Sequence, residues 1–170
     1  MTRATAYLSL GSNLGDRKQN LKEAIRCLDS LGRVLAVSSF YETEPVEFTE
    51  QPLFLNCVVA LETEIEPQQL MRALLHLEQE MGRKRVEKKG PRSIDIDILL
   101  FGETVIDTPE LTVPHPAMAK RRFVLEPLAE IAPDLQIPTS KRTVREVLAE
   151  LPEGQRVEKA WPRISTDSHG

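Results

Sequence analysis

The chain has 170 residues, 41% hydrophobic and 5% aromatic, and its 22 basic and 26 acidic residues give a formal net charge of −4 at pH 7. This length is typical of one domain with a sizeable core, and the acidic balance and scarce aromatics argue against a general nucleic-acid-binding protein. The eight glycines form neither a dinucleotide-binding fingerprint nor a Walker loop, so any bound nucleotide is not held by a glycine-rich loop.

The location of the protein is indicated by what the sequence lacks. Residues 1–10 contain no long apolar run, and no stretch approaches the roughly 18 consecutive apolar residues of a membrane span. Cys27 and Cys57 stand in apolar stretches without metal-ligand spacing, which indicates two reduced thiols. We therefore expect a cytoplasmic protein that does not associate with membranes.

In the N-terminal half, apolar periodicity and the positions of glycine and proline predict three strands and one helix. In chain order we predict a strand over 4–10, a turn over 11–15, a helix over 16–31, a strand over 34–43, a loop over 44–52 and a strand over 53–63.

The C-terminal half continues with a second helix and a strand, followed by shorter elements. We predict a helix over 67–81, a basic loop over 83–92, a strand over 94–101, a tight turn at 102–103 into a strand over 104–106, and helical segments over 117–122, 124–131 and 143–150. Pro67 suits the first turn of its helix, and Gly82 is expected to end it.

The order strand, helix, strand, strand, helix, strand is that of a split β-α-β unit. We therefore predict an α+β fold with a ferredoxin-like βαββαβ core, a mainly antiparallel sheet, an added hairpin and extra C-terminal helices. Residues 1–151 are expected to form a single domain. Residues 152–170 have little periodicity and are expected to form a partly disordered tail.

Positive charge is concentrated in two short segments of this acidic chain. Residues 83–92 carry six basic residues against one acidic residue, and residues 120–122 are all basic, so the remainder of the chain carries −12. Two small basic segments on an acidic body suit a compact polyanion, such as a phosphate chain, better than a long polymer.

Asp95 and Asp97 are the most informative pair in the sequence. On the predicted strand they share one face, with their backbones roughly 6–7 Å apart, because successive side chains alternate between faces. Two neighbouring carboxylates need a positive partner, and Mg²⁺ typically takes one or two carboxylates together with phosphates and water. Taken alone, the same pattern is equally typical of a solvated face on an edge strand.

The neighbouring basic segment favours the metal interpretation. Residues 83–92 lead directly into the strand, and Arg92 stands three residues before Asp95. Carboxylates that hold a cation beside guanidinium groups are what phosphoryl transfer requires. We therefore expect the active site where the basic segment meets the carboxylate pair, and we expect segments 44–52 and 83–92 to become ordered when ligands bind.

The run Gly90-Pro91-Arg92-Ser93-Ile94-Asp95-Ile96-Asp97-Ile98-Leu99-Leu100 closely resembles the signature of 6-hydroxymethyl-7,8-dihydropterin pyrophosphokinases, enzymes of folate biosynthesis. Further matching motifs stand, in order, at residues 10–15, 38–43 with Pro45, 51–56, Glu78 with 82–85, 113–116 and 121–125. The resemblance implies a ferredoxin-like monomer that acts on two small molecules. It would bind ATP with two Mg²⁺ ions, transfer the terminal pyrophosphate to the pterin hydroxymethyl oxygen and release AMP.

The resemblance also implies roles for individual residues. Asp95 and Asp97 would hold both magnesium ions and, with Arg83 and Arg92, form the catalytic set. The residues that would contact the nucleotide are Arg83, Arg85, Arg92, Ile98, Leu111, Thr112, His115 and Arg121. The residues that would contact the pterin are Thr43, Val46, Phe54, Asn56, Asp95 and Phe123, with the two phenyl rings on either side of it.

The chain departs from the commonest family pattern at a few positions. Lys88 and Lys89 stand where the family often has Arg-Trp, and Glu110 stands where some members carry an arginine near the phosphates. The segment Thr43-Glu44-Pro45-Val46 has one proline where other versions have two. These differences bear on loop closure and nucleotide affinity more than on the type of reaction.

Two other function classes stand as alternatives on the sequence. A palm-type two-metal nucleotidyl transferase is also ferredoxin-like, but its carboxylates are expected on separate strands. A ferredoxin-like RNA-binding module would present a basic sheet with aromatic-rich strands. We expect no nucleic-acid partner, because this chain is acidic and carries its paired aspartates on one strand.

Overall fold

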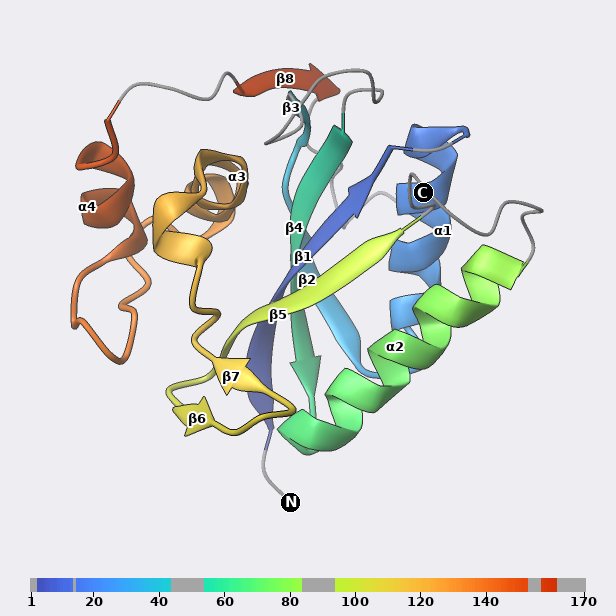
Figure 1. The fold of residues 1–170 in the computed structure, drawn as a ribbon, viewed down its shortest axis with the longest axis horizontal. Helices are drawn as coiled ribbons and strands as arrows, with labels where there is room; N and C mark the ends of the chain where they lie inside the picture. The colour runs from blue at the N-terminus through green and yellow to red at the C-terminus, as the bar shows by residue number, and fades with distance from the viewer. Residues whose placement is uncertain (1–2, 14, 44–53, 84–93, 153–156, 162–170) are drawn as a thin grey trace.

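A six-stranded antiparallel sheet stands between two layers of helices (Figure 1). The computed structural model describes residues 3–13, 15–43, 54–83, 94–152 and 157–161. Helices α1 and α2 cover one face of the sheet, and α3 and α4 lie on the other side. Within the described ranges, no helix combines the length and the apolar character needed to cross a membrane.

The strands of the sheet follow the order β5-β1-β4-β3-β8, and β2 also pairs with β4. Their bounds are β1 (Ala4–Ser12), β2 (Arg33–Val37), β3 (Phe40–Thr43), β4 (Phe54–Thr63), β5 (Asp95–Phe101) and β8 (Val157–Trp161). The remaining elements are α1 (Arg17–Leu28), α2 (Pro67–Arg83), β6 (Ile106–Asp107), β7 (Thr112–Val113), the 3₁₀ helix η1 (Met118–Lys120), α3 (Arg122–Ile131) and α4 (Val144–Ala149). This order confirms the predicted ferredoxin-like βαββαβ core.

The alternation of side chains along the strands creates two hydrophobic cores. On the α1–α2 side, the sheet contributes Leu8, Leu10, Leu55, Cys57, Val59, Leu61, Ile96 and Ile98. The second core, which includes Val58, Leu99, Met118, Val124, Leu125 and Leu128, joins the opposite face to η1, α3 and α4. Each fully buried aliphatic side chain contributes about 1.5–3 kcal/mol, so both helical layers are held firmly.

The second core does not cover the whole of its sheet face. Along β5, Asp97 is exposed, whereas Leu99, two residues further along the strand, is buried in the second core. The polar side chains of the sheet near Asp97 therefore point into open space and are not covered by a helix. This uncovered end of the sheet holds the candidate site.

Several predicted boundaries are wrong for identifiable reasons. β1 continues through Gly11 and Ser12, because both residues pair with β4 and Gly11 also pairs with β5. The hairpin joins β6 to β7, so residues 104–106 do not return along β5. Helix α1 ends at Leu28, earlier than expected, and α2 continues past Gly82 to Arg83.

Two further differences concern the edge of the sheet next to β3. The strand predicted over 34–43 is divided at Ser38 and Ser39 into β2 and β3. Within residues 152–170, residues 157–161 form β8, which pairs with β3. Only pairing with a distant strand gives this segment a regular structure, so its own sequence pattern carries little signal.

Candidate functional site

A cavity of about 200 Å³ opens on the uncovered end of the sheet, opposite α1 and α2. Strands β1, β3, β4 and β5 supply its floor, and the start of α3 supplies one wall. Its lining residues are Ser9, Gly11, Thr43, Phe54, Asn56, Asp95, Asp97, Arg121 and Phe123. Polar and aromatic side chains from separate parts of the sequence thus meet in one small cavity, as is typical of a binding site.

Strand register explains how these side chains come together. Gly11 on β1 is directly opposite Asp95 on β5 and Asn56 on β4, so the three positions form one row across the sheet. Ser9 is opposite Asp97 in the same way. Because directly opposed residues point to the same face, the row places the carboxylates and the amide on one surface.

Gly11 is needed in this row because of the space that Asn56 occupies. A Cβ atom added at Gly11 would lie 2.7 Å from Asn56 Oδ1, well inside van der Waals contact. The amide oxygen of Asn56 therefore occupies the position that a side chain on β1 would fill.

Asn56 is held on its other side by Thr43. Its Nδ2 donates a hydrogen bond of 2.7 Å to Thr43 Oγ1, and the two residues are only 4% and 3% exposed. A buried amide bonded in this way has a fixed orientation. Asn56 can thus present defined hydrogen-bonding groups to a flat polar ligand.

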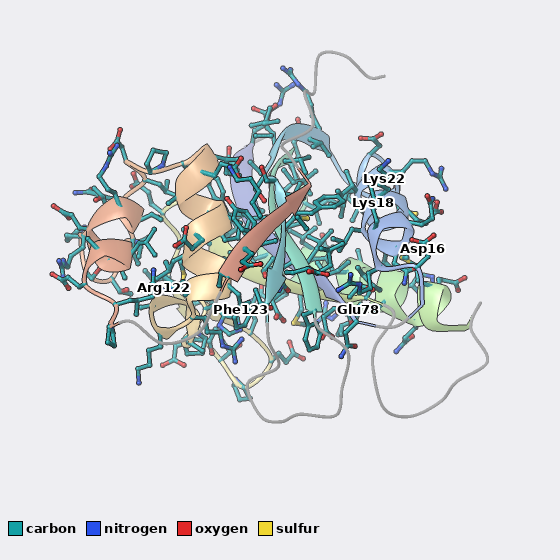
Figure 2. The ribbon with its side chains drawn as sticks, turned by 90° about the horizontal axis from the view of Figure 1, so that it is seen from above. Asp16, Lys18, Lys22, Glu78, Arg122 and Phe123 are labelled. Atoms are coloured by element: carbon teal, nitrogen blue, oxygen red, sulfur yellow. The ribbon has the colours of Figure 1, made fainter. Side chains whose placement is uncertain are left out.

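Phe54 and Phe123 come from two separate elements and both supply aromatic surface to the cavity. Phe54 begins β4. Phe123, which Figure 2 labels, lies in the first turn of α3. The guanidinium of Arg121 lies 5.6 Å from the centre of the Phe123 ring, within the range of a cation–π contact. An aromatic heterocycle between the two phenyl rings would gain offset stacking of about 0.5–1.5 kcal/mol per pair.

A second cavity, of about 360 Å³, lies between β5, β7 and α2. Its lining residues are Met71, Leu74, Leu75, Ile96, Asp97, Ile98, Glu110, Leu111, Thr112, His115 and Pro116. Asp97 lines both cavities, so a carboxylate stands where two ligands would meet. The exposed Glu110 carboxylate lies 3.5 Å from Arg72, at the rim of this second cavity.

His115 is fixed in one tautomer by its backbone surroundings. Its Nδ1 accepts a hydrogen bond of 3.1 Å from the Ala117 N–H, which leaves Nε2 to carry the proton of the neutral ring. Burial lowers the pKa of His115 below its ordinary value; the Asp97 charge opposes this effect, whereas the Arg121 charge adds to it. At neutral pH His115 is therefore an uncharged donor through Nε2.

Comparison with known proteins places these features in a family. The sequence model of the family described as 7,8-dihydro-6-hydroxymethylpterin-pyrophosphokinase (HPPK) matches residues 7–133. The chain belongs to this pterin pyrophosphokinase family. The family predicted from the motif at residues 90–100 is thus confirmed.

Relatives of this chain are known from bacteria and fungi. The 2-amino-4-hydroxy-6-hydroxymethyldihydropteridine pyrophosphokinase of Pseudomonas aeruginosa is 45% identical over 148 residues, which cover 86% of this chain and 91% of that protein. The enzyme of the same name from Bacillus subtilis is 45% identical over 133 residues, covering 77% and 80%. The folic acid synthesis protein fol1 of Schizosaccharomyces pombe is also 45% identical, over 149 residues, but this chain spans only 20% of its length.

Solved structures show the same fold. The HPPK-DHPS protein of Plasmodium falciparum, crystallised with pteroate, superposes with a TM-score of 0.71 at 17% identity. The match covers 88% of this chain and 42% of that one. At such low identity the likeness concerns the fold, and it agrees with the antiparallel sheet described above.

The carboxylates of the first cavity suit magnesium better than a metal that takes all of its ligands from protein side chains. Among the described residues, no group of three or more His, Cys, Asp or Glu side chains could enclose an ion. Asp95 and Asp97 offer carboxylate oxygens at the mouth of an open cavity. Mg²⁺ is usually bound by one or two carboxylates and completes its shell with phosphates and water, so the pair is sufficient.

The predicted site residues fall into three groups. Thr43, Phe54, Asn56, Asp95, Asp97, Arg121 and Phe123 meet in the first cavity, and Ile98, Leu111, Thr112 and His115 meet with Asp97 in the second. Arg83 ends α2, whereas Arg85, Arg92, Val46, Lys88, Lys89 and the segments 44–52 and 84–92 lie outside the described residues.

Sequence reasoning missed Ser9 and Gly11, which line the first cavity. A signal for them is present, because small residues at 9 and 11 alternate with the buried leucines at 8 and 10. The glycines at 11 and 15 favoured a turn and hid this alternation.

Proposed function

We propose that this chain transfers the pyrophosphoryl group of ATP to the hydroxymethyl oxygen of 6-hydroxymethyl-7,8-dihydropterin, releasing AMP, in folate biosynthesis. Family membership supports this reaction, because the named relatives are pyrophosphokinases of this pterin. The observation that carries the proposal is the position of Asp97, which lines both cavities. A transfer between two substrates needs one place where both reacting groups meet.

The first cavity is the pterin site. Its two phenyl rings suit the faces of a flat heterocycle, and the fixed Asn56 amide suits an edge with both donors and acceptors. Thr43 keeps that amide oriented, and Val46, which lies outside the described residues, would add a backbone contact to the pterin as the family resemblance implies. Asp95 would lie beside the hydroxymethyl group.

The second cavity is the nucleotide site. Ile98 and Leu111 supply apolar surface for the adenosine, and Thr112 on β7 supplies a polar contact. The His115 Nε2–H donates to a phosphate oxygen. Arg83, Arg85, Arg92 and Arg121 add guanidinium groups, whose planar donors match phosphate geometry.

Asp95 and Asp97 hold two magnesium ions in this proposal. When bound, these ions neutralise charge on the bridging phosphate oxygens and lower the barrier to transfer. The role of the two side chains is to fix the position of the triphosphate relative to the pterin. The rigid row Asp95–Gly11–Asn56 sets that distance for both substrates.

In the proposed transfer one bond to the β-phosphorus of ATP forms and another breaks. The hydroxymethyl oxygen forms a bond to the β-phosphorus of ATP, and the bond between that phosphorus and the α,β-bridging oxygen breaks. AMP leaves with the bridging oxygen, and the hydroxyl proton passes to solvent. Positioning and charge stabilisation dominate such a reaction, so no strong general base is assigned.

An assay with Mg²⁺, ATP and the reduced pterin tests the function. We expect AMP and the pterin pyrophosphate in equal amounts, with no AMP when the pterin is left out. Release of ADP, or nucleotide cleavage that does not depend on the pterin, would contradict the proposal. Size-exclusion chromatography and fractionation test two accompanying predictions, that the protein is a monomer and that it is cytoplasmic.

A further inference from the structure

Glu130, near the end of α3, binds the segment where β2 gives way to β3. Its Oε1 accepts hydrogen bonds from the Ser39 N–H at 2.9 Å and from the Tyr41 hydroxyl at 2.8 Å. Its Oε2 accepts from the Ser39 hydroxyl at 2.7 Å. Hydrogen bonds to an ionised carboxylate are stronger than those between neutral groups, so three of them tie α3 firmly to this segment.

Both partners of Glu130 are inside the protein. Ser39 is fully buried and Tyr41 is 6% exposed. Burial, and then the bond to Glu130, raise the pKa of Tyr41, so its hydroxyl keeps the proton that it donates. Without Glu130, a backbone N–H and two hydroxyls would lose their acceptor in a region that water reaches poorly.

The bonded segment contains an irregularity that sets the register of β3. Val37 is opposite Val59 on β4, but Tyr41 is opposite Asn56, so four steps along one strand correspond to three along the other. The register changes between Ser38 and Tyr41, because the Ser38 N–H still donates to Val58 O at 2.9 Å and the Ser38 hydroxyl accepts from the Val58 N–H at 2.9 Å. Such a bulge redirects the side chains that follow it.

The side chain redirected into the site is Thr43. It follows Tyr41 by two residues on the same face of β3, and it holds Asn56 through the 2.7 Å bond described above. A return of β3 to regular register would move Thr43 away from Asn56 and turn it to the other face. The bulge is therefore necessary for the polar edge of the first cavity.

The other end of α3 carries the aromatic wall. Phe123 and Glu130 are seven residues apart, which is about two turns, so they lie on one face of the helix about 10 Å apart. Pro127 stands between them and removes one backbone hydrogen bond from this short helix. The orientation of α3 thus depends on its contacts with the sheet, including those of Glu130.

We propose that Glu130 is a positioning residue for the pterin: it holds the bulge that aligns Thr43 with Asn56, and it fixes the helix that carries Phe123. This inference rests on the assignment of the first cavity to the pterin. Glu130 lines neither cavity, so it is not placed to touch either substrate. Its removal should therefore weaken the recognition of one substrate and leave the recognition of the other intact.

The test compares Glu130→Ala with Glu130→Gln. The alanine variant removes all three acceptors, and we expect the KM for the pterin to rise about tenfold while the KM for ATP stays within about twofold. The glutamine variant keeps the shape and one oxygen, and its amide can donate to the Ser39 hydroxyl, so we expect a KM near that of wild type. Quenching of 6-hydroxymethylpterin fluorescence measures pterin binding directly, without turnover.

Thr143→Ala is the matched control for general loss of stability. Thr143 caps α4 and touches neither β3 nor the cavities, so this variant should unfold at a lower temperature with both KM values unchanged. If Glu130→Ala folds poorly, Tyr41→Phe removes one donor to Glu130, and we expect a smaller rise in the pterin KM alone.

Three results would overturn the inference: an unchanged pterin KM in the alanine variant, an equal rise in both KM values, or the same rise in Thr143→Ala. Wild-type protein that releases no AMP with the pterin would instead refute the proposed function. The two failures can be told apart. Failure of the proposed function is seen in wild-type protein alone, whereas failure of the inference is seen in the ratio of the variant's pterin KM to that of wild type.

Discussion

Oε2 of Glu78 accepts a 2.6 Å hydrogen bond from the backbone N–H of Ile96. Ile96 stands between Asp95 and Asp97 on β5, which is an edge strand of the sheet. An outward N–H on an edge strand has no partner strand, and the carboxylate from α2 takes that place. Helix α2, on which Figure 2 labels Glu78, therefore holds the short stretch of backbone that carries both carboxylates.

Glu78→Ala should weaken magnesium use. Without this hydrogen bond the backbone of β5 at Ile96 is held less firmly, so the two neighbouring carboxylates are less well aligned. We therefore expect the Mg²⁺ concentration for half-maximal rate to rise several-fold. Glu80→Ala is the matched control, since Glu80 lies exposed on the same helix. Titration of the rate with Mg²⁺ at saturating ATP makes the measurement, and equal values in the two variants would contradict the prediction.

Gly11→Ala should weaken pterin binding through Asn56. The new Cβ would lie 2.7 Å from Asn56 Oδ1, so the amide must move away from its bond to Thr43. We expect a loss of about 1–3 kcal/mol in pterin binding, the range for disturbing a buried hydrogen bond, with ATP binding unchanged.

Gly82→Ala is the control for the Gly11 prediction. Gly82 lies in α2, and a Cβ there meets nothing within 4 Å. Alanine in a helix stabilises by about 0.5–1 kcal/mol relative to glycine, so this variant should gain stability and keep wild-type pterin binding. Calorimetric titration with 6-hydroxymethylpterin compares the two variants, and equal affinities would show that space at Gly11 is unimportant.

Asp97→Asn should abolish most of the turnover without unfolding the protein. The substitution keeps the shape but removes the charge at the point where the two cavities meet, and we expect kcat to fall by at least about 100-fold. Asp97 is exposed, so its change should leave the thermal transition almost unmoved. Asp107→Asn, exposed on β6, is the control. A near-wild-type kcat in Asp97→Asn would remove this residue from the metal site.

The features that the sequence predicted well are those with a local signal. Asp95 and Asp97 share a face because strand side chains alternate, and this alternation is visible in the residues themselves. The pairing of Asn56 with Gly11 was not predictable in this way, because it depends on the register between β1 and β4.

The bulge before β3 and the strand β8 were even harder to predict from the sequence, because each depends on residues far away in the chain. The bulge between Ser38 and Tyr41 depends on Glu130, which is 91 residues away from Ser39 in the sequence. Strand β8 depends on β3, which precedes it by more than a hundred residues. Local propensity carries no information on such partners, so a continuous strand over 34–43 and a tail without regular elements were the natural predictions.

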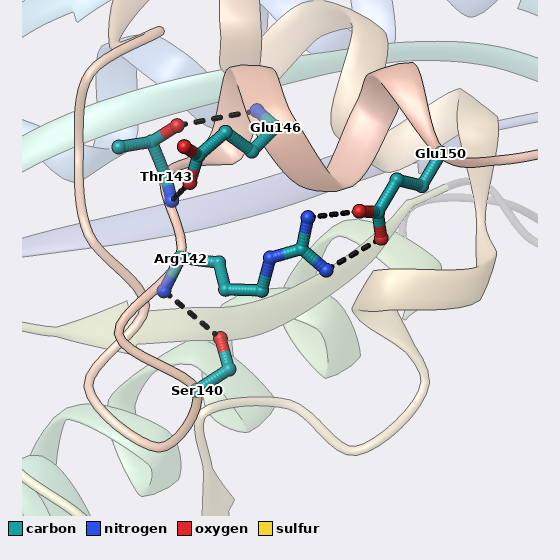
Figure 3. Close-up of polar contacts among 5 residues, drawn as sticks. All are labelled: Ser140, Arg142, Thr143, Glu146 and Glu150. Atoms are coloured by element: carbon teal, nitrogen blue, oxygen red, sulfur yellow. Dashed lines mark hydrogen bonds and ion pairs between the residues drawn. The ribbon is translucent and has the colours of Figure 1, made fainter.

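The last prediction concerns stability and pH at α4, remote from both cavities. The guanidinium of Arg142 donates to both carboxylate oxygens of Glu150, and the Thr143–Glu146 capping box begins the helix beside them (Figure 3). The hydrogen bond to Arg142, and then the attraction between the two charges, lower the pKa of Glu150 below its ordinary 4.5. The folded state therefore binds this proton less readily than the unfolded state does.

A carboxyl group whose pKa is lowered by folding stabilises the folded state at every pH above its ordinary pKa. This stabilisation is lost as the pH falls through the lower pKa of the folded state. Glu150→Gln should therefore reduce the free energy of unfolding at pH 7, and the difference from wild type should shrink below pH 4.5. Urea unfolding of both proteins from pH 7 to about pH 3 measures the trend. In an Arg142→Gln background the same substitution should show little pH dependence, because the group that lowers the pKa is gone. A difference as large at pH 3 as at pH 7 would mean that Glu150 contributes through its shape and not through its charge.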